Sequence, residues 1–263
     1  MKTQPVKRKI TIEPKSHVDS IRYSLATMYE HKHFIEDKSG CKTLEIIGAS
    51  FPADEDSVLG TPNKDYIKRE LEWYESQSLF VQDIPGDTPK IWKECASNLG
   101  VINSNYGYLI FSEDNVSQYQ NVLQELGENP NSRRAIMIYT RPQIWLDYYI
   151  DGMSDFICTN SVQYFIRNGE LWVDVCMRSN DIVFGYNNDL AWQKYVQEKL
   201  IDDLETDTGT RYGKGEILWH VGSFHLYERH FPLLEEWMKE NWKPQVEWPE
   251  DTEWTEQDVE VGH

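Results

Sequence analysis

One cysteine and several arginines in the middle of the sequence have the residue types needed for chemistry on a phosphorylated molecule. Cys158 stands between the pair Arg133-Arg134 and the pair Arg178-Ser179. Arginine forks bind phosphate oxygens in pairs, and a serine hydroxyl adds a donor. A free thiol has a pKa of ~8.5, so a nearby cation such as Arg178 must stabilise the thiolate. The alternative is an inert buried cysteine and arginines in ordinary surface ion pairs.

Two further groups have spacings that suit a site. Glu70 lies beside apolar helix positions such as Leu71, where desolvation raises a carboxyl pKa toward the range of acid–base catalysis. The alternative, an exposed helix charge, fits Glu72 better. His225 and Tyr227 are two residues apart and therefore face the same side of a strand, although both could simply belong to a packed strand with satisfied polar tips.

The elements that must position these residues alternate between helical and strand-like patterns. Helices are expected over residues 15–34, 66–76, 114–126 and 189–204, with Gly127 as the C-terminal cap of the third. Strands are expected over 42–51, 134–140, 159–167, 170–177 and 217–226. The strand over 134–140 looks buried, and Asn168-Gly169 predicts a hairpin. The pattern indicates an α/β or α+β fold with a mixed sheet.

Composition excludes several classes of protein. The net charge of -18 repels phosphate backbones, so nucleic-acid binding is not expected, whereas a small phosphorylated ligand stays compatible. No run of eighteen apolar residues and no signal peptide occur, which predicts a cytoplasmic protein without a membrane span. The four cysteines and seven histidines lack metal-ligand spacing, so reduced thiols and no metal are expected.

The C-terminus differs from the rest of the chain. Seven acidic residues and no lysine or arginine lie between Glu247 and Glu260. We therefore expect one folded domain over residues 1–246 and an acidic, partly disordered tail over 247–263. Trp248 and Trp254 are the residues through which this tail would dock.

The motifs occur in an order that resembles the thymidylate synthase superfamily. They are NPNSRR (129–134), Cys158, MRSND (177–181), the loop 185–189, ELEW (70–73), Tyr106-Gly107 and His225-Leu226-Tyr227. This resemblance covers roughly residues 35–232 and implies a thymidylate synthase-like fold with a mixed sheet, one face of which forms a homodimer. The bacteriophage deoxycytidylate hydroxymethylases are the most similar branch, through EIIGAS (45–50), RELEWY (69–74), IMIYTRP (136–142), DGMSDF (151–156) and AWQKYV (191–196).

The resemblance implies a role for each basic residue around a nucleotide. Cys158 is implied to add to carbon 6 of the pyrimidine. The phosphate would be bound by Arg133, Arg134, Arg178 and Ser179, with the first two reaching across the twofold axis into the partner subunit's site. Lys38 stands where the family has an arginine and supplies charge without the fork.

The resemblance also implies roles for residues around the base, sugar and folate. His225 and Tyr227 would bind the deoxyribose hydroxyl, and Glu70 would belong to a water network that moves protons. Tyr106 is similar to a tyrosine near the reacting carbon. Asp181 is similar to the aspartate that binds the pterin ring of the co-substrate, 5,10-methylenetetrahydrofolate.

Asp189 is the residue expected to choose the base. It lies 31 positions after Cys158, where uracil-specific thymidylate synthases carry asparagine. Cytosine presents an amine donor beside a bare ring nitrogen, and a carboxyl that carries or shares a proton matches this edge. Mispaired buried polar groups cost about 1–3 kcal/mol each, which is enough to discriminate. The alternative is that Asp189 caps the following helix.

The expected reaction is therefore hydroxymethylation of deoxycytidylate (dCMP). Water, rather than a hydride from folate, would complete it. Two departures favour water: Ile157 and Thr159 flank the cysteine where the synthases have proline and histidine, and the chain ends in a long acidic tail. The rivals are a synthase or hydroxymethylase acting on deoxyuridylate (dUMP), and a non-catalytic nucleotide- or RNA-binding protein.

Overall fold

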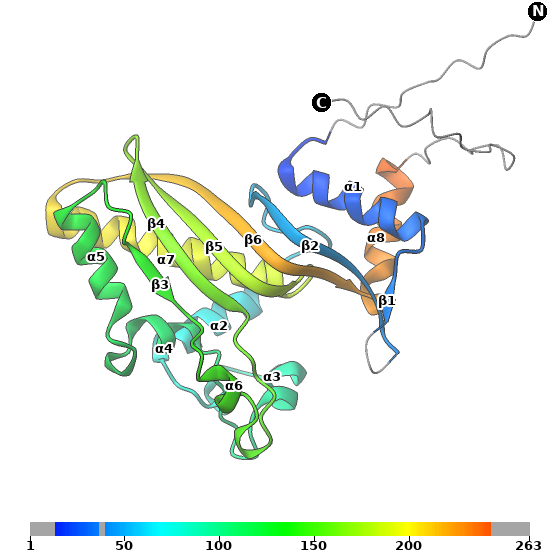
Figure 1. The fold of residues 1–263 in the computed structure, drawn as a ribbon, viewed down its shortest axis with the longest axis horizontal. Coiled ribbons are helices and arrows are strands. Elements are labelled where there is room, and N and C mark those ends of the chain that lie inside the picture. Colours follow the sequence, from blue (N-terminus) through cyan, green and yellow to red (C-terminus); the bar gives the residue numbers. More distant parts are fainter. Residues whose placement is uncertain (1–13, 37–39, 243–263) are drawn as a thin grey trace, which may run out of the picture.

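The computed structural model describes residues 14–36 and 40–242, which form a mixed sheet with helices packed against it (Figure 1). The strands are β1 (Ile35–Glu36), β2 (Lys42–Pro52), β3 (Ile136–Ile138), β4 (Thr159–Arg167), β5 (Glu170–Asp181) and β6 (Gly213–Tyr227). The helices are α1 (His17–Glu30), α2 (Lys64–Ser76), α3 (Lys90–Cys95), α4 (Tyr106–Phe111), α5 (Gln118–Glu128), α6 (Ile144–Asp147), α7 (Gly185–Thr208) and α8 (Phe231–Asn241). Short 3-10 turns are η1 (Val81–Asp83), η2 (Glu113–Asn115), η3 (Ile150–Gly152) and η4 (Glu228–His230).

The sheet has the strand order β1-β2-β6-β5-β4-β3. Only β5 and β6 pair in parallel, and every other neighbouring pair is antiparallel. A parallel pair needs a long crossover, which here contains α7. The predicted mixed sheet is confirmed, and so is the hairpin between β4 and β5. Asn168 and Gly169 both adopt positive φ, as its tight turn requires.

The side-chain alternation breaks at one level in three neighbouring strands. In β5 the buried residues are odd-numbered up to Met177, and the next buried residue is Asn180. In β6 they are odd-numbered up to Val221, and the next buried residue is Phe224. β2 makes the same change near Gly48, whose φ is +67°. A Cβ atom at Gly222 would lie 2.7 Å from the Arg178 carbonyl oxygen, so a side chain at this position of β6 would press on β5. The break redirects the last residues of β5 and β6, which carry predicted site residues.

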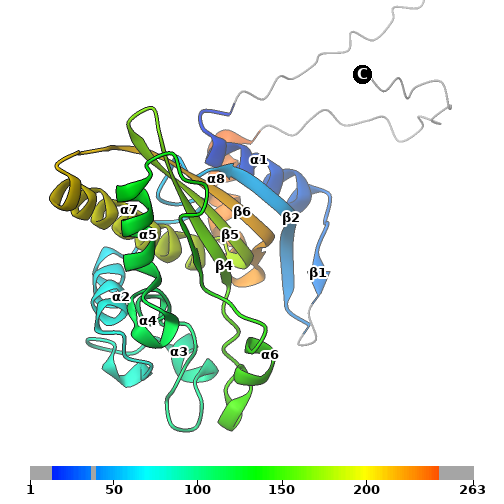
Figure 2. The same ribbon diagram turned by 60° about the vertical axis from the view of Figure 1, so that its left-hand side comes forward.

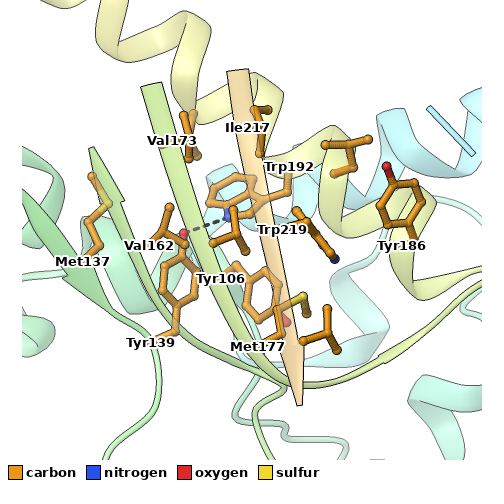
Figure 3. Packing of buried hydrophobic residues seen from close by; sticks show 14 of the residues in the cluster. Tyr106, Met137, Tyr139, Val162, Val173, Met177, Tyr186, Trp192, Ile217 and Trp219 are labelled. Carbon is orange, nitrogen blue, oxygen red and sulfur yellow. Dashed lines mark hydrogen bonds between the residues drawn. The ribbon is translucent and has the colours of Figure 1, made fainter. Parts of the chain in front are cut away.

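One face of the sheet packs on a core of large aromatic side chains (Figure 3). Trp192 on α7 is fully buried, and its indole nitrogen donates a hydrogen bond to the Tyr139 hydroxyl at 3.1 Å. Trp219 on β6 packs against Tyr186 with ring centroids 5.5 Å apart. The helices α2, α4, α5 and α7 gather on this side of the sheet (Figure 2). These buried side chains form a packed layer between the sheet and the helices.

Two predictions about the α5–β3 region are wrong. The expected helix 114–126 is interrupted at Val116 and Ser117, both at positive φ, and α5 begins only at Gln118. Gly127 lies inside α5 rather than capping it, because the helix continues to its C-cap at Asn129. Gly127 has no positive φ, so it does not act as the left-handed cap that the sequence suggested.

The segment expected as a buried strand over 134–140 is a short strand at the edge of the sheet. β3 contains only residues 136–138, with Met137 buried and Ile136 and Ile138 exposed by 39% and 57%. Its outer face continues across β4, β5 and β6 with apolar and polar side chains that are at most partly buried. They include Gln163, Phe165, Trp172, Asp174, Leu218 and His220. Figure 1 shows this face without a covering helix among the described residues.

Some predictions fall outside the part of the chain that the structure describes. Lys38 and the acidic tail with Trp248 and Trp254 belong to these residues. The expected boundary between residues 246 and 247 lies there as well, so the division into domain and tail stays a prediction.

Candidate active site

Cys158 lies directly before β4 and beside the end of β5. The Arg178 guanidinium donates a hydrogen bond to its sulfur at 3.4 Å. The same side chain is held by the carbonyl oxygens of Phe156 and Ile157, and it stacks over the Phe156 ring at 4.8 Å. Burial raises the pKa of the thiol to about 11, although Arg178 acts to lower it, and the Asp189 and Asp155 carboxyls raise it further. The resting thiol is therefore protonated at neutral pH.

The Asp189 carboxyl lies on the first turns of α7 and is partly buried. Asn180 donates a hydrogen bond from its side-chain nitrogen to Asp189 Oδ2 at 2.7 Å. Desolvation raises the pKa of this carboxyl well above its usual range, the nearby Glu70 adds to that effect, and hydrogen bonds from Asn180 and Tyr106 oppose it. A neutral carboxylic acid can both donate and accept a hydrogen bond. The alternative, that Asp189 caps the following helix, is wrong, because α7 begins at Gly185 and Asp189 lies inside it.

Glu70 is buried on α2, as the sequence predicted, with 5% of its surface exposed. The Tyr66 hydroxyl donates to Glu70 Oε1 at 2.5 Å, and the Trp92 indole nitrogen reaches the same oxygen at 3.4 Å. Burial raises the pKa of Glu70 to about 7, even though both hydrogen bonds act to lower it. A carboxyl with this pKa can accept and donate a proton near neutral pH. Glu72, by contrast, is exposed.

Tyr106 opens helix α4 and is held between other aromatic rings. It stacks on Tyr74 at 5.4 Å and meets the edge of Tyr139 at 5.2 Å. Its hydroxyl accepts a hydrogen bond from the Thr159 hydroxyl at 3.0 Å. Both Cys158 and Asp189 influence its pKa, which burial raises well above the usual value. The tyrosine hydroxyl is therefore a neutral donor close to the sulfur and the carboxyl.

The ends of β5 and β6 bring four further predicted residues together. Asp181 lies opposite His225 in the parallel pair, and Ser179 lies opposite Ser223. The His225 and Tyr227 rings face the same side, with centroids 4.8 Å apart. Burial raises the pKa of the Tyr227 hydroxyl, and the charges of Asp181 and Cys158 contribute to this rise. The same-side orientation predicted for this pair is confirmed.

Arg133 and Arg134 do not lie with the other site residues. Both are exposed, and Arg134 forms an ion pair with Glu125 at 3.0 Å. The Ala135 carbonyl pairs with Tyr164 near the far end of β4, so Arg133 lies about eight residues along this strand from Cys158. At ~3.3 Å per residue this separation is roughly 25 Å, which an arginine side chain cannot span. Within one chain, these arginines cannot bind a nucleotide attached to Cys158.

Several contacts within the site were not predicted from the sequence. Asn180 and Thr159 hold Asp189 and Tyr106, while Tyr66 and Trp92 surround Glu70. The spacing of Tyr66 and Glu70, one helical turn apart, was a usable signal. The other contacts join residues far apart in the chain, for which no sequence spacing gives a signal.

The described residues contain no group of three or more histidine, cysteine, aspartate or glutamate side chains that could hold a metal ion. Within the same residues, none of the helices has the length and apolar character needed to cross a membrane.

A folate- and nucleotide-dependent transferase is the class of protein that this fold and cluster resemble, and the comparison with known families agrees. The chain belongs to the thymidylate synthase family, whose model matches residues 23–261. Thermostable thymidylate synthase A from Bacillus subtilis has a similar fold, with a TM-score of 0.61 and 24% identity over 84% of each chain.

Among individual proteins, the deoxycytidylate 5-hydroxymethyltransferase of Enterobacteria phage T4 is 59% identical over 223 residues, which are 84% of this chain and 91% of that protein. The phage T2 protein of the same name is also 59% identical, over 221 residues. The thymidylate synthase of Bacillus atrophaeus is 29% identical over 189 residues, or 69% of this chain and 77% of that protein. The resemblance predicted from the motifs is confirmed both for the thymidylate synthase family and for the phage hydroxymethyltransferases within it.

Proposed function

We propose that this protein is a dCMP 5-hydroxymethyltransferase. It transfers the methylene carbon of 5,10-methylenetetrahydrofolate to carbon 5 of dCMP and adds water, which gives 5-hydroxymethyl-dCMP and tetrahydrofolate. The observation that carries the choice of base is the Asp189 carboxyl near Cys158 and Tyr106, whose pKa desolvation raises well above its usual range. The 59% identity to phage proteins named for this activity supports the same conclusion. We place the reaction in the cytoplasm, where thiols stay reduced.

The Cys158 sulfur starts the reaction by adding to carbon 6 of the base. This addition breaks the aromaticity of the ring and makes carbon 5 nucleophilic. The electrons displaced from carbon 6 move toward ring nitrogen 3, so an acid at residue 189 that donates to this nitrogen stabilises the charge as it forms. Because the resting thiol is protonated, Arg178 is needed to stabilise the sulfur anion at the moment of attack.

Asp181 and Phe184 provide groups that suit a pterin ring. The partly exposed Asp181 carboxylate accepts hydrogen bonds from the Val183 and Phe184 backbone amides. The Phe184 side chain is exposed by 57% and presents apolar surface. A pterin needs an acceptor for its N–H groups and an apolar surface for its ring, so these residues fit it. When bound, the folate supplies the methylene carbon.

Glu70 is the group that we expect to move protons around the base. Its pKa of about 7 allows it to be protonated or ionised at working pH. Tyr66 and Trp92 hold its Oε1 oxygen, so the second oxygen stays available for water or substrate. Ser179, His225 and Tyr227 lie toward the same strand ends and would bind the phosphate and the sugar hydroxyl, together with Lys38.

A homodimer completes the phosphate site in this proposal. Arg133 and Arg134 are too far from Cys158 in their own chain, so they act in the site of the partner subunit. The open sheet face, with Ile136, Ile138 and the partly buried Phe165 and Trp172, supplies an apolar surface for this association.

Two measurements test the proposed function. Mass spectrometry of the product distinguishes a hydroxymethyl from a methyl group, since they differ by one oxygen. Release of tritium from carbon 5 of labelled dCMP and dUMP measures which base is activated. Faster release from dUMP, or a methylated product, would refute the proposal. Binding of RNA in a gel-shift experiment at physiological salt, without turnover, would favour the non-catalytic rival.

Replacing Asp189 tests the reading of the base. The Asp189→Asn variant should shift kcat/KM from dCMP toward dUMP by about tenfold to a hundredfold, because an amide donates to the uracil carbonyl and accepts from its N–H. Initial rates with both nucleotides measure the shift. Unchanged selectivity would show that this residue does not read the base.

A further inference from the structure

We propose that Asn180 is a positioning residue that fixes which oxygen of the Asp189 carboxyl carries the proton, and thereby sets the preference for cytosine over uracil. This inference rests on the proposed function, because it concerns the choice between dCMP and dUMP. Asn180 itself need not touch the nucleotide, because it acts through Asp189.

The orientation of the Asn180 amide is fixed by Trp219. The Trp219 indole nitrogen, which can only donate, reaches Asn180 Oδ1 at 3.4 Å. The amide nitrogen must therefore face the other way, where it donates to Asp189 Oδ2 at 2.7 Å. Asn180 is 3% exposed and Trp219 is fully buried, so water does not compete for these positions. Figure 3 shows Trp219 in the aromatic core beside Tyr186.

Gly185 makes room for this arrangement at the first turn of α7. A Cβ atom at residue 185 would lie 2.9 Å from Asn180 Nδ2 and 3.4 Å from Asp181 Cβ. Any other residue at this position would therefore press on the amide nitrogen that contacts Asp189. The glycine, the tryptophan and the asparagine together hold one donor against one carboxyl oxygen.

This donor determines the hydrogen-bonding pattern that Asp189 presents. An oxygen that accepts a short N–H hydrogen bond favours the carbonyl form, so the proton of the neutral carboxyl resides on Oδ1. Desolvation raises the pKa of this carboxyl well above its usual range, which favours the protonated form. Asp189 thus offers a donor at Oδ1 and an acceptor at Oδ2.

A carboxylic acid without this restraint would match both bases. Cytosine needs a donor toward ring nitrogen 3 and an acceptor toward its amine, whereas uracil needs the reverse. The acid could satisfy either base by moving its proton from one oxygen to the other. With Oδ2 directed toward the 4-substituent and kept as an acceptor by Asn180, this oxygen would face the 4-carbonyl oxygen of uracil, which is also an acceptor. The proton on Oδ1 would face the N–H at position 3 of uracil, which is also a donor.

The test compares kcat/KM for dCMP and dUMP in two variants of the full-length enzyme. Asn180→Leu removes the donor at similar volume, and the ratio of dCMP to dUMP should fall by about tenfold. Asn180→Asp replaces the donor with an acceptor that draws the proton onto Oδ2, so the ratio should fall further than in Asn180→Leu. Equal loss of activity with both nucleotides, and no change in the ratio, would overturn the proposal.

Three further variants separate positioning from folding. In an Asp189→Asn background the Asn180 donor opposes the amide orientation that reads uracil, so adding Asn180→Leu should move the ratio further toward dUMP. Trp219→Phe removes the anchor of the amide, together with some buried ring volume, and keeps the donor itself, so it should lower the ratio by a smaller factor than Asn180→Leu. This variant keeps the test decisive if Asn180→Leu does not fold, and an unchanged ratio in it would then count against the proposal. Asn187→Ala removes a different buried amide, on α7, and should change kcat/KM for dCMP and for dUMP by the same factor.

The outcomes also distinguish this inference from the proposed function. If the wild-type enzyme activates dCMP and Asp189→Asn shifts the preference, the proposed function stands whatever Asn180 does. If the wild-type enzyme prefers dUMP, the proposed function fails before the role of Asn180 is reached.

Discussion

Burial and the charge of Arg178 act in opposite directions on the pKa of the Cys158 thiol, and burial has the larger effect. The nearby guanidinium of Arg178 lowers the pKa, yet desolvation and two nearby carboxyls hold it at about 11. A thiol that is protonated at rest is protected from oxidation and from adventitious electrophiles. The nucleophile is thus formed only during attack on a bound base.

Alkylation of the nucleotide-free enzyme should reveal this high pKa. The rate at Cys158 should rise about tenfold per pH unit between pH 7 and pH 10, because only the thiolate reacts. Iodoacetamide labelling followed by peptide mass spectrometry measures it, with Cys158→Ser as the control for the other thiols. A plateau below pH 8 would contradict the expected protonation state.

Glu70 should destabilise the folded protein at high pH. Its pKa rises from 4.5 to about 7 on folding, so the folded state binds a proton that the unfolded state has released. The penalty is absent below pH 4.5, grows between pH 4.5 and 7, and is fully present above pH 7. At 1.36 kcal/mol per pKa unit, it amounts to about 3 kcal/mol.

The Glu70→Gln variant has no such titration. Its free energy of unfolding, relative to wild type, should therefore rise by about 2–3 kcal/mol between pH 5 and pH 8. Urea denaturation at both pH values measures the difference, and kcat should fall at the same time because the proton carrier is lost. A difference that is the same at both pH values would show that Glu70 is ionised in the folded protein.

At the scale of elements, the site depends on the close approach of α2 and α4. A Cβ atom at Gly107 would lie 1.7 Å from the Tyr74 carbonyl oxygen, so only glycine lets the two helices meet. This contact allows Tyr106 to stack on Tyr74 and to reach the region of Cys158 and Asp189. The glycine therefore positions a site residue without contacting the substrate.

Two glycine substitutions should have opposite effects on stability. Gly107→Ala should destabilise the protein by about 3 kcal/mol or more, since a backbone must move. Gly127→Ala lies inside α5, where the nearest atom to the new Cβ is a Thr208 methyl at 3.5 Å. It should stabilise the protein by about 0.5–1 kcal/mol, because alanine favours the helix. Thermal unfolding of both variants measures the contrast, and destabilisation by Gly127→Ala would contradict the helical assignment.

At the scale of the whole molecule, the separation of the arginines from Cys158 predicts sites shared between subunits. Cys158→Ser and Arg133→Ala should each be nearly inactive alone. Mixed and allowed to exchange subunits, they should recover about one quarter of wild-type activity, since half of the dimers are mixed and each mixed dimer has one intact site. Activity after refolding the mixture measures this recovery. Absence of recovery, in mixtures shown to exchange, would indicate that Arg133 acts within its own chain or not at all.

Local spacing and the order of short motifs were enough to predict the mixed sheet, the hairpin at Asn168-Gly169, the burial of Glu70 and the family. They were not enough to predict where α5 begins or ends, since Val116 and Ser117 adopt positive φ in spite of their residue types. The folded chain was needed to show that Asn180 contacts Asp189, that Trp219 fixes the Asn180 amide, and that burial outweighs Arg178 at the Cys158 thiol. Desolvation and hydrogen-bond direction depend on neighbours from distant segments, which sequence spacing does not encode.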